Sequence, residues 1–319
     1  MRWSPVAAYY LALCMNPNKG AHHAEWTARP ERSNQFMMRV MTWISLHLGR
    51  PVARSILPLI AGYFLCFAPA SRRASRAYLT RVLARPVTWR DMYRHFLTFA
   101  ATVHDRVYLV NRRFDLFEFD IHGEDKLREV LSEGKGLFLL GAHLGSFEVI
   151  RALGRKTPGL RVAMLMHEPN ARKINSMLAA INPEATQDII GLGHVDSMLQ
   201  VHARLARGET VGMLADRTLG DDILHPVPLL GDTAYLPEGP FRMAALLQRP
   251  VLFMVGLYQG GNRYAIHFEP LADFSTVDRS QRDQAILAGL VRYGALLDHY
   301  CREAPDNWFN FYDFWRRPS

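Results

Sequence analysis

The stretch Gly136-Leu-Phe-Leu-Leu-Gly-Ala-His143-Leu-Gly-Ser-Phe-Glu148-Val-Ile-Arg-Ala-Leu decides how the rest of the chain is interpreted. Residues 137–140 form a continuous apolar run bounded by glycines, which is typical of a strand covered on both faces. Glycines 141 and 145 bracket a turn, and Ser146 is a candidate N-cap for a following helix. This order places His143 at the carboxyl end of a strand, where open α/β sheets bind ligands.

His143 and Glu148 are candidates for an acid–base pair. Histidine is the usual general base near neutral pH, because its ordinary pKa of about 6.5 lets it take up and return a proton. A neighbouring carboxylate can fix the tautomer of the ring and stabilise the imidazolium. We therefore predict that Glu148, in the first turn of the helix, orients His143. The alternative is that Glu148 only interacts with the helix dipole and that His143 is a turn residue.

The spacing His143-x4-Glu148 resembles the His-x4-Asp/Glu signature of the lysophospholipid acyltransferase superfamily. Its Glu form, within Gly-Ala-His-Leu-Gly-Ser-Phe-Glu, resembles the branch of late lipid A (lauroyl/myristoyl) acyltransferases. The resemblance runs from residue 25 to the end of the chain. It includes, in the order of that family, Ala215-Asp216-Arg217, Val227-Pro-Leu-Leu-Gly231, Leu236-Pro-Glu-Gly-Pro240 and Pro305-Asp-Asn-Trp308.

This resemblance implies an acyltransferase of lipid A or related glycolipid biosynthesis, which moves a fatty acyl chain from a thioester to a hydroxyl of a membrane glycolipid. Its expected donor is acyl carrier protein. Its expected location is the cytoplasmic face of the bacterial inner membrane, held peripherally or by a single N-terminal anchor. The ending Asn307-Trp-Phe-Asn-Phe-Tyr-Asp-Phe-Trp315 departs from the Trp-x-Trp-x-x-Arg ending of that family, which favours a related but distinct acceptor.

Two other functions remain open on the residues alone. A thioesterase or lipid hydrolase would use the same His–Glu pair to activate water. A membrane-surface lipid-binding protein would use neither residue for catalysis. No metal or cofactor is expected, because the histidines and the three cysteines lack metal-ligand spacing and the chain has no dinucleotide or P-loop motif.

Four further residues are candidates for substrate binding. Asp216 and Arg217 directly follow a predicted buried strand, so we expect them on the same sheet edge as His143. The planar guanidinium of Arg217 suits a substrate phosphate or carboxylate, although a structural Asp–Arg pair is the alternative. Backbone amides near Gly145, together with Arg217, are predicted to stabilise an oxyanion. Glu238 resembles the glutamate of the acceptor-binding Pro-Glu-Gly block of glycerophosphate acyltransferases.

Alternating strands and helices predict an α/β fold with a layered, mainly parallel sheet flanked by helices. The catalytic domain is assigned to residues 114–319, and residues 231–239 are expected to form a loop over its cleft. Expected strands are 114–121, 161–166, 187–190, 210–215, 251–258 and 263–268. Expected helices are 88–111, 124–131, 171–181, 195–206, 240–247 and 281–300.

The N-terminal third is strongly basic. Residues 1–113 carry 17 Lys and Arg against 4 Asp and Glu, whereas the remainder carries 21 against 26. Such a segment favours an anionic partner, either nucleic acid or an anionic lipid surface. No aromatic stacking platform or nucleic-acid motif accompanies the arginines, so a lipid surface is expected and nucleic acid is not.

Residues 36–70 are the candidate membrane segment. Their apolar residues recur at helical spacing, Pro51 opens a nearly uncharged run interrupted by Pro58, and Arg72, Arg73 and Arg76 follow. The run is shorter than the about 20 residues of a spanning helix, which favours an amphipathic or partly inserted anchor. An ordinary buried helix pair is the alternative. Residues 25–113 are thus assigned to a helical membrane-associating segment, and residues 1–24 to a disordered or mis-annotated start.

Overall fold

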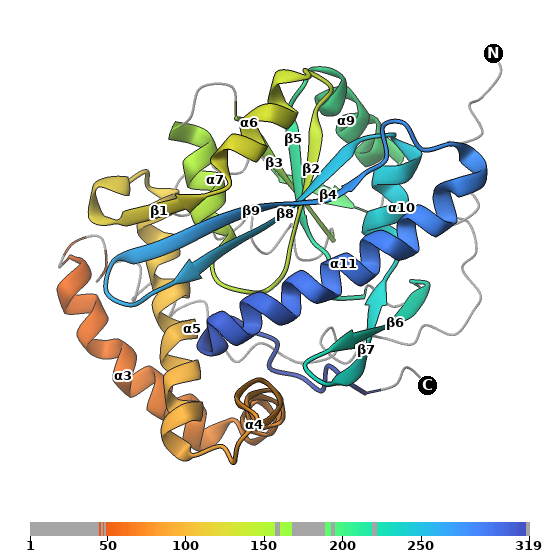
Figure 1. Ribbon diagram of the computed structural model, residues 1–319. Coiled ribbons are helices and arrows are strands. Elements are labelled where there is room, and N and C mark those ends of the chain that lie inside the picture. The colour runs from red at the N-terminus through yellow and green to blue at the C-terminus, as the bar shows by residue number, and fades with distance from the viewer. Residues whose placement is uncertain are drawn as a thin grey trace.

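A seven-stranded sheet forms the centre of the protein. The computed structural model describes residues 45, 47, 49–156, 160–167, 189–192, 195–218 and 222–316 of the 319-residue chain. The strand order is β1-β9-β8-β2-β5-β3-β4 (Figure 1). Strands β8, β2, β5, β3 and β4 run parallel, β9 is antiparallel to β8, and β1 is parallel to β9. The bounds are β1 Glu118–His122, β2 Leu137–Gly141, β3 Val162–His167, β4 Ile189–Leu192, β5 Thr210–Leu214, β8 Pro250–Tyr258 and β9 Arg263–Asp273.

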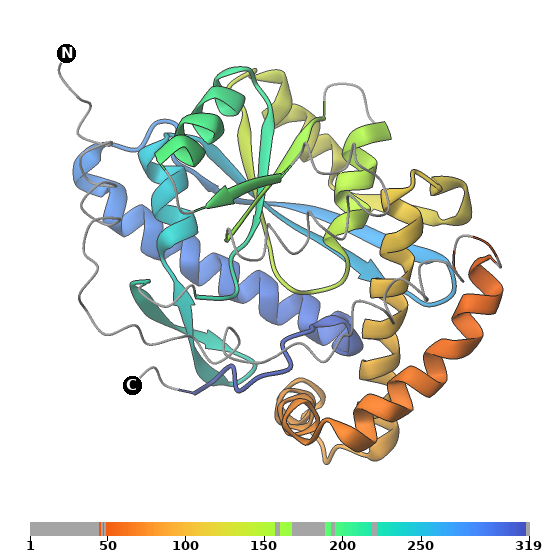
Figure 2. The same ribbon diagram turned by 180° about the vertical axis from the view of Figure 1, so that it is seen from behind.

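Helices cover both faces of this sheet, as opposite views show (Figures 1 and 2). The helices in the described part of the chain are α3 Arg50–Phe67, α4 Pro69–Leu83, α5 Trp89–Val110, α6 Glu124–Ser132, α7 Phe147–Lys156, α9 Val195–Ala206, α10 Gly239–Leu246 and α11 Arg282–Glu303, and α3 packs on α4 and α5. Alternate residues of β2 enter two separate core clusters, Phe138 and Leu140 on one face and Leu137 and Leu139 on the other. Because successive strand side chains point to opposite faces, β2 is covered on both sides. The predicted fold, a layered and mainly parallel α/β sheet, is confirmed.

The boundaries of most elements lie close to the predicted ones. The predicted helix 88–111 is observed as α5, which begins with a capping box between Thr88 and Asp91. The predicted strand 114–121 is only partly correct, because the chain first makes the 3-10 turn Phe114–Leu116 before β1. The predicted helix 171–181 and the N-terminal residues 1–24 lie outside the described residues.

The expected loop at residues 231–239 is wrong. Strands β6 (Leu224–Leu229) and β7 (Asp232–Pro237) form an antiparallel hairpin there, which packs on α11. Pro226 and Pro228 hide the strand pattern, since proline donates no ladder hydrogen bond. Pro226 and Pro228 are two residues apart in β6, an edge strand. Every second backbone nitrogen of an edge strand points away from its partner strand and makes no ladder hydrogen bond, so the hairpin accommodates both prolines.

The N-terminal helices share a core with the sheet. Leu79 of α4 and Phe96 of α5 belong to the same cluster as Phe138 of β2. Between α3 and α5, the buried Asp105 carboxylate accepts hydrogen bonds from Arg50 and Arg54, the former at 2.9 Å. This ion-pair network holds α3 against α5.

Helix α3 has two distinct faces. Pro51 lies in its first turn, as predicted for the residue that opens the second apolar segment. One face packs inward through Ala53, Leu57, Ala61 and Leu65. The other exposes Val52, Leu59, Tyr63 and Phe67 to between 46% and 74%. Within the described part of the chain, α3 is the one helix long and apolar enough to cross a membrane.

Candidate active site

Two neighbouring strands bring His143 and Asp216 together. Gly141 of β2 is paired with Leu214 of β5 in parallel register. His143 and Asp216 each follow this pair by two residues, so both side chains emerge at the same carboxyl edge. The N–H of Ala215 donates to the carbonyl of Gly141 at 2.9 Å, which extends the ladder into the turn.

The Asp216 carboxylate holds the His143 ring and its backbone. Nδ1 of His143 lies 2.8 Å from Oδ1 of Asp216, and the His143 amide donates to Oδ2 at 3.0 Å. With an ionised carboxylate at Nδ1, the neutral ring carries its proton there and leaves the lone pair of Nε2 as an acceptor. Among the described residues, none contributes a hydrogen bond to Nε2. The His143 side chain is 28% exposed, so the ring is only partly covered by the protein.

Burial and neighbouring charges tune both groups. Burial lowers the pKa of His143, and the positive charge of Arg217 lowers it further, whereas Asp216 acts in the opposite direction. Burial alone would raise the pKa of Asp216, but His143, Arg217 and the hydrogen bonds that it accepts hold it well below its usual range. The pair therefore rests as a neutral imidazole beside a carboxylate near neutral pH.

The loop that carries His143 requires glycine at position 145. Gly145 has φ +70° and approaches β8 so closely that an added Cβ would lie 2.1 Å from the carbonyl oxygen of Gly256. The next amide, that of Ser146, donates to the same carbonyl at 2.8 Å, and α7 begins directly afterwards. A side chain at position 145 would displace the histidine loop from the sheet.

A C-terminal segment closes the site on its other side. We call residues 307–310 the C-terminal strap. Its backbone runs antiparallel to the histidine loop: Gly145 donates to the carbonyl of Asn307 at 2.8 Å, and Phe309 donates to the carbonyl of His143 at 2.7 Å. The strap also donates two side-chain hydrogen bonds to Oδ2 of Asp216, from Trp308 at 3.1 Å and from Asn310 at 2.8 Å.

The predicted site residues do not all lie together. His143, Asp216 and Arg217 gather at the carboxyl edge of β2 and β5. Glu148 is nearly buried in the first turn of α7, where its Oε1 lies 3.8 Å from Nε of Arg106. Nδ1 of His143 is thus hydrogen-bonded to Asp216, and the orienting role of Glu148 stays a prediction.

Gly145 and Glu238, the other two candidates for substrate binding, make their hydrogen bonds within the protein. The amide of Gly145 donates to the strap, so in this conformation it is not available to an oxyanion. Glu238 precedes α10, where it is buried between His225, at 2.6 Å, and Arg242. Its substrate-binding role also stays a prediction.

The structure adds residues that the sequence did not single out. Trp308 ends the Pro305-Asp-Asn-Trp308 block that carries part of the family resemblance, and Asn310 lies in the ending that departs from the family, but neither was assigned to the site. Arg106 lies on α5, and its charge acts on both Glu148 and His143. Short-range patterns hold no signal for these contacts, because they join segments far apart in the chain.

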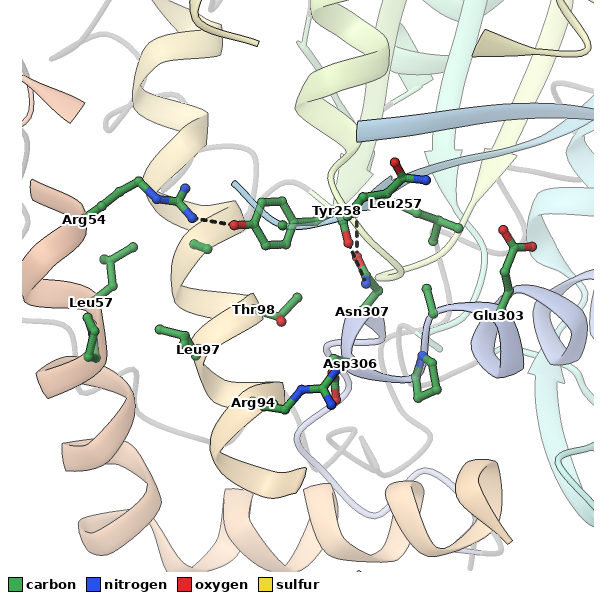
Figure 3. Close-up of a pocket in the computed structure, with 16 residues that line it drawn as sticks. Arg54, Leu57, Arg94, Leu97, Thr98, Leu257, Tyr258, Glu303, Asp306 and Asn307 are labelled. Carbon is green, nitrogen blue, oxygen red and sulfur yellow. Dashed lines mark hydrogen bonds and ion pairs between the residues drawn. The ribbon is translucent and has the colours of Figure 1, made fainter. Parts of the chain in front are cut away.

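A cavity of about 580 Å³ lies near the strap but does not contain the histidine (Figure 3). It is lined by α3, α5, the end of β8 and the chain after α11, and Asn307 forms part of its wall. Among the described residues, no group of three or more His, Cys, Asp or Glu side chains could hold a metal ion.

A family model described as bacterial lipid A biosynthesis acyltransferase matches residues 25–317. This range begins where the resemblance in the sequence begins, and it includes the histidine loop, Asp216 and the C-terminal strap. A comparison with curated proteins finds no match.

Proposed function

The chain belongs to the bacterial lipid A biosynthesis acyltransferase family, and from this premise we propose how it transfers an acyl chain. Membership makes it an acyltransferase that acts on lipid A-like lipids. Beyond family membership, we propose the identity of the acyl donor, the chemical roles of the site residues and the association of the protein with a membrane. Acyl carrier protein is the proposed donor, by resemblance to the late lipid A acyltransferases. The proposed acceptor is a hydroxyl of a membrane glycolipid, or the 3-hydroxyl of an acyl chain already on it.

The observation that carries the mechanism is the His143–Asp216 pair. Asp216 fixes the proton on Nδ1 and leaves the lone pair of Nε2 as an acceptor on a partly exposed ring, which is the arrangement that a general base needs. Nε2 accepts the proton of the acceptor hydroxyl as its oxygen attacks the thioester carbonyl. The thiolate then leaves and takes the proton back from the imidazolium, so that one ester forms and one thioester is broken without a covalent enzyme intermediate.

Arg217 is the proposed electrostatic partner of this reaction. Its Nε donates to Asn310 at 2.8 Å and its guanidinium lies 5.6 Å from the ring centroid of Tyr312. These contacts fix a positive charge beside His143, whose pKa that charge lowers. A fixed charge in a buried site stabilises negative charge that develops on the thioester oxygen or is carried by a substrate phosphate.

Helix α3 supports the proposed membrane association. Its exposed apolar face is followed on α4 by Arg73 and Arg76, which are also exposed, and Arg72 lies 5.3 Å over the ring of Trp89. Apolar side chains flanked by arginines and an interfacial aromatic residue suit the surface of an anionic bilayer. Because Asp105 ties the opposite side of α3 to α5, we propose a helix that lies in the interface rather than one that crosses the membrane.

Product analysis tests the reaction type. The wild-type protein is incubated with acyl carrier protein thioester carrying a labelled acyl chain, with and without a lipid A-type acceptor. The proposal predicts labelled acylated glycolipid that requires the acceptor, and little free fatty acid. Release of label mainly as free fatty acid in both mixtures would instead identify a hydrolase.

A further inference from the structure

Asn310 lies between two opposite charges at the active site. Its Nδ2 donates to Oδ2 of Asp216 at 2.8 Å, and its Oδ1 accepts from Nε of Arg217 at 2.8 Å. Only this orientation of the amide satisfies both neighbours, because a guanidinium can only donate and a carboxylate can only accept. One buried side chain thus sets the positions of both charged groups relative to each other.

Trp308 makes the second contact of the strap with the carboxylate. Its indole Nε1 donates to Oδ2 of Asp216 at 3.1 Å, and the ring is 1% exposed. Together with the His143 amide, Trp308 and Asn310 give Oδ2 three donors, while Oδ1 is left to the histidine ring. A buried carboxylate with one oxygen fully engaged in this way cannot rotate away from Nδ1 without losing several charge-assisted hydrogen bonds.

The strap itself is anchored from both sides. On α5, Nε2 of His95 lies 2.9 Å from the carbonyl oxygen of Trp308, and the other ring nitrogen of His95 lies 2.9 Å from Oγ of Ser75. At the end of β8, the side chain of Asn307 accepts from the amide of Tyr258 at 2.8 Å and donates to its carbonyl at 3.2 Å (Figure 3). The strap is therefore a rigid part of the fold, and its donors are held in place before substrate arrives.

From this geometry we propose that Trp308 and Asn310 are positioning residues of the acyl transfer, acting through Asp216 and Arg217. The inference rests on the proposed function, because it assigns these residues to the reaction at His143. It makes the C-terminal strap part of the active site, although it lies more than 160 residues after the histidine in the chain. A purely structural role would instead make the strap a packing element whose loss lowers only the amount of folded protein.

Three single variants separate these roles. Trp308→Phe keeps an aromatic ring and removes the N–H, Asn310→Leu removes both hydrogen bonds, and Asn310→Asp places a negative charge beside Asp216. The matched controls are Trp315→Phe, which removes an indole N–H that contacts Leu229 instead, and Asn111→Leu, at the end of α5. Each protein is purified in full length and its melting temperature is measured, so that activity is expressed per folded molecule.

The first readout is steady-state acyl transfer. We expect Trp308→Phe and Asn310→Leu to lower kcat by on the order of 10–100-fold with KM changed less than about threefold, since a misplacement of about 1 Å can cost 10²-fold in rate. The controls are expected to keep wild-type kcat. Asn310→Asp is expected to move the acid limb of kcat/KM to higher pH, because added negative charge favours the imidazolium of His143. If both hydrogen-bond variants keep wild-type kcat and an unchanged pH profile, the proposal is overturned.

The second readout does not depend on turnover. Protein labelled with 15N-histidine is titrated by NMR, and the signal of His143 is identified by its loss in His143→Ala. The proposal predicts that the Asn310→Asp signal titrates at higher pH than wild type, and that the Asn111→Leu signal does not shift. An Asn310→Asp signal that titrates as in wild type would overturn it. A wild-type protein with no acyl transfer but with the predicted titration shift would count against the proposed function alone.

Discussion

The carboxylate that contacts His143, the proposed general base, follows the neighbouring strand: Oδ1 of Asp216 lies 2.8 Å from Nδ1 of His143. The two residues are 73 positions apart, and parallel pairing of β2 with β5 brings them to the same edge. Asp216 is fully buried and accepts donors on both oxygens, so it is held more rigidly than a surface carboxylate would be.

Removing the charge of Asp216 should therefore cost most of the activity. We expect Asp216→Asn to lower kcat by about 10²–10⁴-fold, because an amide at this position no longer stabilises the tautomer and the imidazolium. Glu148→Gln, whose described partner is Arg106, should cost less. Steady-state acyl transfer by both variants checks the order, with the exposed Asp120→Asn as the control. A larger loss in Glu148→Gln than in Asp216→Asn would return the orienting role to Glu148.

The pH dependence follows from the charges around His143. The ring must be neutral to accept a proton, so activity is present above its pKa in the folded protein and is lost as the pH falls through it. Burial and Arg217 lower this pKa, so the acid limb of kcat/KM should lie below the ordinary histidine value of about 6.5. Removing the positive charge in Arg217→Leu should raise the pKa and move the limb to higher pH. Arg128→Leu, which removes an exposed cation, should leave the limb in place, and an unshifted limb in Arg217→Leu would contradict this account.

Two glycines with similar backbone angles should respond differently to alanine. Gly134 and Gly145 have φ +68° and +70°, so the strain of a left-handed alanine, about 1–2 kcal/mol, applies to both. Only at Gly145 would the new Cβ collide, with the carbonyl of Gly256, whereas Gly134 has nothing within 4 Å. Overpacking should add about 1–3 kcal/mol to the loss of unfolding free energy for Gly145→Ala. Chemical denaturation of both variants measures the difference, and equal losses would show that the histidine loop can move away from β8.

Membrane binding should depend on the exposed face of α3. Replacing Leu59, Tyr63 and Phe67 by serine removes apolar surface that is more than half exposed, so the fold should stay intact. Burial of one such side chain in a bilayer is worth about 1.5–3 kcal/mol, so we expect more than tenfold weaker binding to anionic vesicles. Cosedimentation with vesicles checks this result. Leu199→Ser, an exposed apolar residue on α9, is the control, and equal binding by the α3 variant and the wild type would refute an α3 docking face.

The sequence predicted the parts of the site that depend on local patterns. An apolar run between glycines located β2, and a strand followed by Asp216 and Arg217 placed those two side chains at the same edge as His143. Local patterns also placed α5 and α9, where apolar periodicity is strong. The β6–β7 hairpin was missed, because Pro226 and Pro228 break the usual strand composition although an edge strand tolerates them.

The detailed partnerships of the site depend on register and on distant segments. The pairing of Gly141 with Leu214 determines that Asp216, and not the adjacent Arg217, lies opposite His143. No short sequence pattern predicts that register. For the same reason a short pattern predicts the nearby Glu148, five positions from the histidine, as the orienting carboxylate, and that role stays a prediction. The donors Trp308 and Asn310 reach the site only because the chain returns after α11 along the histidine loop.

The most direct test of the account is the rate of acyl transfer by His143→Ala. Full-length wild type and variant are compared in membranes or detergent, with labelled acyl carrier protein thioester and a lipid A-type acceptor, after melting temperatures show that both are folded. The account predicts that wild type forms labelled glycolipid and that the variant loses at least about 10²-fold in kcat, since it lacks the general base. A folded His143→Ala protein that transfers the acyl chain at close to the wild-type rate would contradict the central claim.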